Sequence, residues 1–191
     1  LLPADKCKCM VQSSNAGSNP FVPYFGGSGA TTCSPGPDEM RVTFGDRGYS
    51  GVDHVTIPPV TYDHSGSGYT VKLSNWTHTR DYAKGFLRNI AGNGQAVVEG
   101  LIAGTTYSYK IYQYASLYAS TNEYRVNGVS LGFTTSRDSD EPTATGKAVA
   151  DALGKITFTF VNLNGHVHLS GIDMGPYAEG CVYDRQASTA S

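Results

Sequence analysis

Two histidines, His166 and His168, come closest to a metal-binding pair in this sequence. Residues two apart on a β-strand point to the same face, so two imidazoles at this spacing can reach one ion. Zinc sites use three or four protein ligands, and no third ligand is obvious in the sequence. We therefore predict no metal at this pair.

A second group of candidate ligands lies in the acidic segment RDSDEP, which holds Asp138, Asp140 and Glu141. Their carboxylate oxygens are ligands of the type that calcium prefers. A short run of acidic side chains is more often a solvated loop. A solvated loop is our expectation here.

No set of residues in the sequence predicts catalysis. The segment GGSGA, residues 26–30, approaches the nucleophile elbow, but it lacks the strand before it and the helix after it that this motif requires. Asp53-His54 and Asp63-His64 repeat an acid–base dipeptide, yet consecutive strand residues point to opposite faces. We predict no catalytic residue and a protein that is not an enzyme, because a lyase or hydrolase would need such residues.

The cysteines indicate disulfides. All of them lie outside the strand-rich middle of the chain, and a Cys-x-Cys pair rarely closes on itself. We expect the first two to pair with the last two, in an oxidising compartment. A four-thiolate zinc site is one rival interpretation, but its paired knuckle spacing is absent, and free or intermolecular thiols are the other alternative. The residues are Cys7, Cys9, Cys33 and Cys181.

Further features favour a secreted, extracellular glycoprotein. Asn75-Trp76-Thr77 is an N-glycosylation acceptor triplet. The chain begins Leu1-Leu2-Pro3, which we interpret as the start of a processed or trimmed polypeptide. The formal net charge is −2 and the basic residues are scattered, so nucleic acid is not an expected partner. No apolar run has the length of a membrane span.

The elements that must position these residues are short β-strands. From Arg41 onward, β-branched and aromatic runs alternate with Gly and Pro, which is typical of an all-β sandwich, and no segment has a helical period. The expected strands are 41–45, 69–74, 95–101, 106–114, 123–127, 129–135, 146–151, 155–161 and 166–174.

Turn residues predict how some strands connect. Asn127-Gly128 favours a two-residue type I′ hairpin, and Asp151 to Gly154 a second tight connection. After it, Ile156, Phe158 and Phe160 alternate with threonines, which predicts one buried and one wet face. Around Gly171 the parity of apolar residues changes, as it does at a β-bulge.

These motifs resemble those of the galactose-binding-like jelly-roll family, whose members occur as carbohydrate-binding and adhesion modules in secreted proteins. The resemblance covers residues 41–175 and rests on GLIAGTTY, YRVNG, GKITFTF and LSGIDM. It implies a jelly-roll β-sandwich. Family members often hold a structural calcium, but the usual acidic pair early in the first strand is not evident, so no cofactor is predicted and a structural calcium stays open.

Tyrosines are unusually dense between residues 105 and 128. In a strand over 106–114, Tyr107 and Tyr109 point one way and Lys110 the other, and the lysine marks the wet side. The sequence thus predicts an exposed tyrosine face that suits a sugar ring or a protein partner. Coverage by the N-terminal arm and a subunit contact are the alternatives. The predicted site comprises Tyr112, Tyr114, Tyr118 and Tyr124, with Gln113 and Asn122 as hydrogen-bonding neighbours.

We therefore expect three segments: an N-terminal arm (1–40), a β-sandwich (41–175) and a C-terminal tail (176–191). The predicted function is a secreted, non-catalytic module that binds carbohydrate or an extracellular matrix component. The alternative is a structural subunit that uses the arm to self-associate into a homo-oligomer, extracellular fibre or coat.

Overall fold

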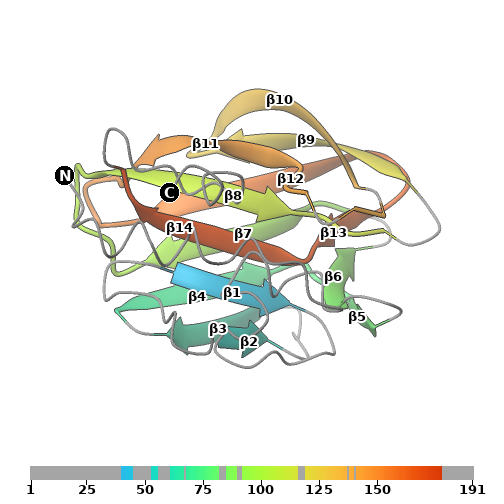
Figure 1. Ribbon diagram of the computed structural model, residues 1–191, viewed down its shortest axis with the longest axis horizontal. Helices are drawn as coiled ribbons and strands as arrows, with labels where there is room; N and C mark the ends of the chain where they lie inside the picture. Colours follow the sequence, from blue (N-terminus) through green and yellow to red (C-terminus); the bar gives the residue numbers. More distant parts are fainter. Residues whose placement is uncertain are drawn as a thin grey trace, which may run out of the picture.

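A computed structural model describes residues 40–44, 53–55, 61–66, 68–81, 85–89, 92–115, 119–136, 138–139 and 141–177 (Figure 1). All regular elements in this part of the chain are β-strands, so the predicted all-β class is confirmed. The four cysteines, Tyr118, Asp140 and segment 26–30 lie outside the described residues, as do almost all of the arm and the tail.

The described strands follow the alternation of apolar and polar residues. They are β1 Met40–Phe44, β2 Asp53–Val55, β3 Thr61–Gly66, β4 Tyr69–Ser74, β5 His78–Asp81, β6 Gly85–Asn89, β7 Gly94–Glu99, β8 Thr106–Tyr112, β9 Ser120–Val126, β10 Val129–Ser136, β11 Ala144–Val149, β12 Ile156–Asn164, β13 Val167–Leu169 and β14 Gly171–Pro176.

Two larger sheets face one another across the core. The five-stranded sheet has the order β11-β8-β14-β1-β2, and the six-stranded sheet has the order β10-β9-β12-β7-β4-β3. A three-stranded sheet, β13-β6-β5, lies beside them (Figure 1). Pairing is antiparallel except between β1 and β2.

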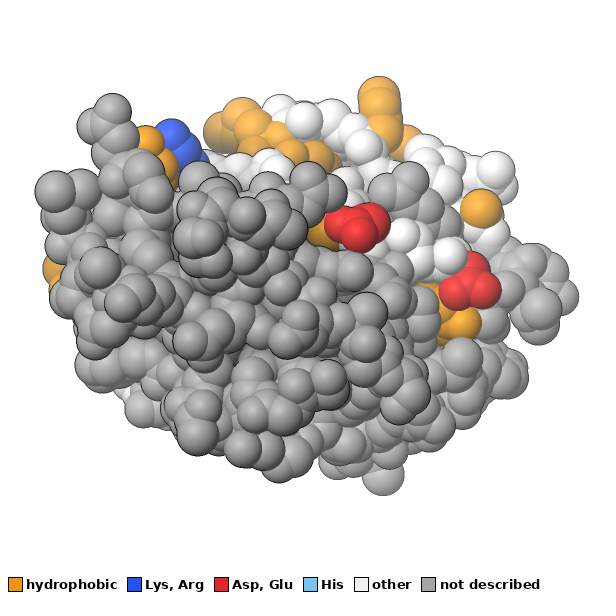
Figure 2. Space-filling view, in the orientation of Figure 1, with side chains coloured by type: hydrophobic (Ala, Val, Ile, Leu, Met, Phe, Trp, Pro, Cys, Tyr) orange, Lys and Arg blue, Asp and Glu red, His pale blue; other side chains and the backbone are white. Residues whose placement is uncertain are grey.

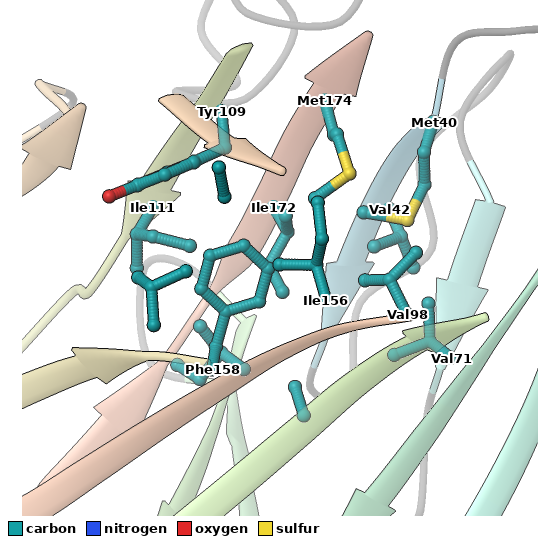
Figure 3. Packing of buried hydrophobic residues seen from close by; sticks show 14 of the residues in the cluster. Met40, Val42, Val71, Val98, Tyr109, Ile111, Ile156, Phe158, Ile172 and Met174 are labelled. Atoms are coloured by element: carbon teal, nitrogen blue, oxygen red, sulfur yellow. The ribbon is translucent and has the colours of Figure 1, made fainter. Parts of the chain in front are cut away.

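Aromatic and aliphatic side chains from both larger sheets fill the core. Tyr109 of β8 meets Phe158 of β12 edge to face, with ring centroids 5.1 Å apart. Ile172 and Met174 extend from the same side as Tyr109, and Ile156 from the same side as Phe158 (Figure 3). The predicted burial of Tyr107, Tyr109, Phe158 and Phe160 is confirmed.

The predicted hairpin is confirmed. Asn127 and Gly128 have φ values of 51° and 81°, as a type I′ turn requires, and Val126 pairs with Val129 across it. The turn around Asp151 is also present, and the Asp151 carboxylate accepts hydrogen bonds from the backbone N–H groups of Leu153 and Lys155. It connects strands of the two different larger sheets, β11 and β12.

The parity change near Gly171 marks a change of sheet. The expected single strand 166–174 is two strands: β13 pairs with β6, whereas β14 pairs with β1 and β8. Ser170 separates them, and its hydroxyl accepts a hydrogen bond from the Tyr114 N–H. Residues of both parities are buried here because the chain passes from one sheet to the other.

Candidate functional site

The predicted exposure of the tyrosine face is wrong for Tyr112 and Tyr114, whose side chains are buried. Lys110 and Tyr112 do point away from Tyr109, but only 4% of Lys110 and 3% of Tyr112 is exposed. Asp173 of β14 lies directly opposite Lys110 and is buried as well. Lys110 is therefore a buried charged residue opposite a carboxylate, and its presence does not indicate a solvent-exposed face.

The other described members of that predicted site are also internal, whereas Tyr118 lies outside the described residues. Tyr114 is buried, and Tyr124 is partly buried against the core. Gln113 and Asn122 are fully enclosed and bond to each other, with the Gln113 side-chain amide donating to Asn122 Oδ1 at 3.0 Å. Gln113 also accepts from the Thr143 hydroxyl at 2.8 Å. These amides tie the end of the sandwich together and are not available to a ligand.

A buried serine–histidine pair lies in the same region. Ser136 Oγ is 3.0 Å from His168 Nδ1, and it also donates to the Ser120 carbonyl at 3.3 Å. Ser136 and His168 are 0% and 3% exposed, so no substrate can reach the hydroxyl. Burial, and to a smaller extent the charges of neighbouring His166 and Arg88, together lower the pKa of His168 to about 3. Ser136 and His168 are as close as the serine and histidine of a nucleophilic dyad, but both are buried and a substrate cannot reach them.

The two histidines do come together, with ring centroids 6.0 Å apart. Within the described ranges, no three His, Cys, Asp or Glu side chains gather in a way that could hold a metal ion. Asp138 and Glu141 of the acidic segment are exposed. Asn75, the predicted glycosylation site, is exposed in a bend after β4 and has a φ of 67°.

The outer face of the six-stranded sheet is the accessible polar surface among the described strands. Strand register places Ser74 (β4), Gln95 (β7), Thr159 (β12) and Arg125 (β9) in one row across it. The Ser74 hydroxyl donates to Gln95 Oε1 at 3.5 Å, and Gln95 Nε2 donates to Thr159 Oγ1 at 3.4 Å. Neither contact is tight, so a competing hydroxyl can replace it at little cost.

Charged side chains lie in this row and beside it, in one pair and one group of three. Arg125 donates from Nε and Nη2 to the two oxygens of Glu123, at 2.9 and 3.3 Å. These bonds and one from Ser130 hold the pKa of Glu123 below its usual value. At the other side, Glu99 lies between Lys155 (2.7 Å) and Lys72 (3.3 Å). The pKa of Glu99 is lowered, first by the hydrogen bond from Lys155.

An apolar strip borders the polar row. Phe133 of β10 lies opposite Glu123 and is 71% exposed, and Val161 of β12 lies on the other side of Glu123. Leu163, further along β12, is 51% exposed. Sequence analysis missed Phe133 because the strand pairing shifts between Ser130 and Gly132, which breaks simple alternation. Gly132, with φ of 120°, is the local signal of that shift.

No helix in the described part of the chain has the length and hydrophobicity to span a membrane. No protein-family model and no curated protein matches the sequence.

Similar solved structures are mainly carbohydrate-binding modules. The CBM36-1 domain of a multidomain xylanase from the hindgut metagenome of Trinervitermes trinervoides is 15% identical, with a TM-score of 0.37 over 53% of this chain and 88% of that one. A family 35 carbohydrate-binding module from Clostridium thermocellum is 11% identical, with a TM-score of 0.40 over 56% of this chain and 92% of that one. CBM35 from Paenibacillus barcinonensis is 18% identical, with a TM-score of 0.36 over 62% of this chain and the whole of that one. The chain is thus an all-β protein with several sheets, and the solved structures similar to it are mainly carbohydrate-binding modules.

Proposed function

We propose that this protein is a secreted, non-catalytic module that binds a polysaccharide on the outer face of the six-stranded sheet. The observation that carries the proposal is an exposed aromatic ring, Phe133, beside a row of hydrogen-bonding side chains. An aromatic ring offers an apolar surface to one face of a sugar, and amide, hydroxyl and guanidinium groups exchange hydrogen bonds with its hydroxyls.

The dimensions of the face suit an extended ligand. From β10 to β4 the sheet crosses four strand spacings, which is about 19 Å at roughly 4.8 Å per strand. Each contact is modest, so we expect weak affinity, on the order of micromolar to millimolar. Rigid strands hold the groups in place, so binding needs little rearrangement.

Affinity electrophoresis in gels that contain soluble polysaccharides tests the proposal. Wild-type protein is expected to be retarded by at least one polymer, and Phe133→Ala and Gln95→Ala to lose that retardation while they keep the wild-type circular dichroism spectrum. The matched control is Leu153→Ala, which removes a 77% exposed apolar side chain from the turn after β11.

Absence of retardation by every polymer of a broad panel would reject the proposed function. If both Phe133→Ala and Gln95→Ala are still retarded like wild type, the binding site lies on another part of the molecule.

One observation favours the alternative of a self-associating subunit. The edge strand β10 has no charged residue, and its Val129 and Leu131 are exposed. Hydrophobic side chains show at the upper rim of the molecule in Figure 2, where β10 and β11 lie in Figure 1. Uncharged, apolar edge strands tend to pair with other strands. Sedimentation of the purified protein with and without reductant tests this reading: a monomer in both conditions contradicts it.

A further inference from the structure

Every charged side chain described on the outer face of the six-stranded sheet has an oppositely charged neighbour. We infer that the ligand of this face is a neutral polysaccharide and not one built from uronic acids. The inference rests on the proposed function, since it concerns the same site. The inference follows from three groups of oppositely charged side chains. In two of these groups the charged atoms lie within 3.3 Å of each other.

The first group is Arg125 with Glu123. Both oxygens of the carboxylate accept from the guanidinium, so the positive charge is already matched. Arginine has five N–H donors, and two are used here. The other N–H groups can donate to sugar hydroxyls without offering a net charge to a ligand carboxylate.

The second group is Glu99 with Lys155 and Lys72. Lys155 Nζ contacts Oε1 and Lys72 Nζ contacts Oε2, so one carboxylate joins two ammonium groups. The third group is Asp63 with Lys72, because Asp63 of β3 lies directly opposite Lys72 of β4. Asp63 adds the negative charge that makes the numbers of cations and carboxylates equal. The described face thus carries three cations (Lys72, Arg125, Lys155) and three carboxylates (Asp63, Glu99, Glu123).

A uronic acid would need a cation that is not already neutralised. To bind Arg125, its carboxylate would have to displace Glu123 or come to rest beside it, and two like charges at such a distance repel. A neutral hydroxyl meets no such cost. The charge arrangement therefore selects against acidic polymers at the same place where the row of Ser74, Gln95 and Thr159 accepts neutral ones.

The experiment compares neutral polymers (galactan, glucomannan and unsubstituted xylan) with polygalacturonate in affinity gels at low and high salt. We expect wild-type protein to be retarded by a neutral polymer, with the same retardation at both salt concentrations, and not by polygalacturonate. Retardation by polygalacturonate but by no neutral polymer would overturn this inference and leave the proposed function standing. If no polymer retards the protein, the proposed function fails, and the inference fails with it.

Glu123→Gln tests the cause of the selectivity. Glutamine keeps the size and a hydrogen-bond acceptor for Arg125 but removes the charge that matches it. We expect this variant to gain affinity for polygalacturonate by about tenfold over wild type, and to lose the gain at high salt. The matched control, Glu141→Gln, removes one exposed negative charge from the loop before β11 and should gain nothing. If both variants gain affinity for polygalacturonate equally, or if Glu123→Gln gains none, the ion pair of Arg125 with Glu123 is not the cause of the selectivity against acidic polymers.

Discussion

At the residue scale, His168 is a buried imidazole held in its neutral form. Its Nδ1 contacts Ser136 Oγ, and His166 and Arg88 oppose any positive charge on it. Nearly all of the ring is removed from water, so protonation has no solvent to stabilise it. The imidazole of His168 is therefore protonated more easily in the unfolded chain than in the folded protein.

This difference predicts acid sensitivity. The pKa of His168 is about 3 in the fold and close to 6.5 in the unfolded chain, so between these values the unfolded state binds the extra proton. The free energy of unfolding contributed by this group is fully present above pH 6.5 and falls as the pH drops toward 3, by up to about 3 to 5 kcal/mol.

NMR titration of the imidazole resonances measures the pKa directly, and urea melts of wild type and His168→Gln at pH 7 and 4.5 measure the effect on stability. Glutamine does not titrate, so its melts should shift less between the two pH values. A His168 resonance that titrates near pH 6.5, or parallel shifts of the two proteins, would contradict the prediction.

Residue-level prediction from sequence succeeded for the core and failed for the exposure of Tyr112 and Tyr114. Parity correctly put Tyr107 and Tyr109 inside, because one face of β8 meets Phe158. It also correctly put Lys110 and Tyr112 on the other face, but the conclusion that this face is wet needed knowledge of what lies over it. Strand alternation identifies opposite faces and cannot tell a solvated face from a covered one.

Tyr112→Ala follows from that correction. Because the ring is buried, its removal should lower the free energy of unfolding by about 3 to 5 kcal/mol, similar to the loss for Phe158→Ala in the core between the sheets. Urea melts of the two variants test this, with Leu153→Ala as an exposed control that should cost less than about 0.5 kcal/mol. A cost for Tyr112→Ala near that of the control would restore an exposed tyrosine face.

At the element scale, the β9–β10 hairpin does more than reverse the chain. The Asn127 side chain donates to the Val149 carbonyl at 2.9 Å, where β11 ends, and accepts from the Thr157 N–H at 2.9 Å in β12. One turn residue therefore fastens the hairpin to both larger sheets. The sequence NG predicted the turn, but these two bonds depend on strands that are distant in the chain.

Two substitutions separate the turn conformation from these bonds. Asn127→Gly keeps a residue that tolerates positive φ and loses both side-chain bonds, with an expected cost of about 1 to 3 kcal/mol. Asn127→Ala loses the bonds and also strains the backbone, so it should cost about 1 kcal/mol more. Thermal melts measure the difference, and equal stability of Asn127→Gly and wild type would show that the side-chain bonds contribute nothing.

Four described strands, β2, β3, β5 and β6, were not predicted, and two of them, β3 and β5, are polar and lack apolar alternation. β3 reads TYDHSG and lies at the edge of its sheet, and β5 reads HTRD. Polar edge strands are held by backbone pairing with an apolar neighbour, such as β4 for β3. Their own side chains therefore carry little of the signal that periodicity detects.

At the scale of the whole molecule, the two larger sheets have different outer surfaces. The outer positions of the six-stranded sheet are partly or fully exposed and most of them are polar, whereas the middle of the five-stranded sheet buries Lys110, Tyr112, Asp173 and Thr43 on its outer side. Sequence alternation alone treats both sheets alike. A ligand can therefore contact the outer side chains of the six-stranded sheet, whereas those in the middle of the five-stranded sheet are covered.

β1 and β14 give the molecule a mechanical property. They are antiparallel neighbours, with Met40 opposite Met174, so the chain enters the described strands at Met40 and leaves them at Pro176 on the same end of one strand pair (Figure 1). Tension applied between these two points acts along the hydrogen bonds that join the strands, since those bonds lie perpendicular to an antiparallel pair. The hydrogen bonds between β1 and β14 then break one after another. If the strands were instead pulled along their length, all of these bonds would carry the force together. A module pulled from both of these points would open first between β1 and β14, at a lower force than the same strands need in shear, and this opening would draw Met40 and Val42 of β1 out of the core.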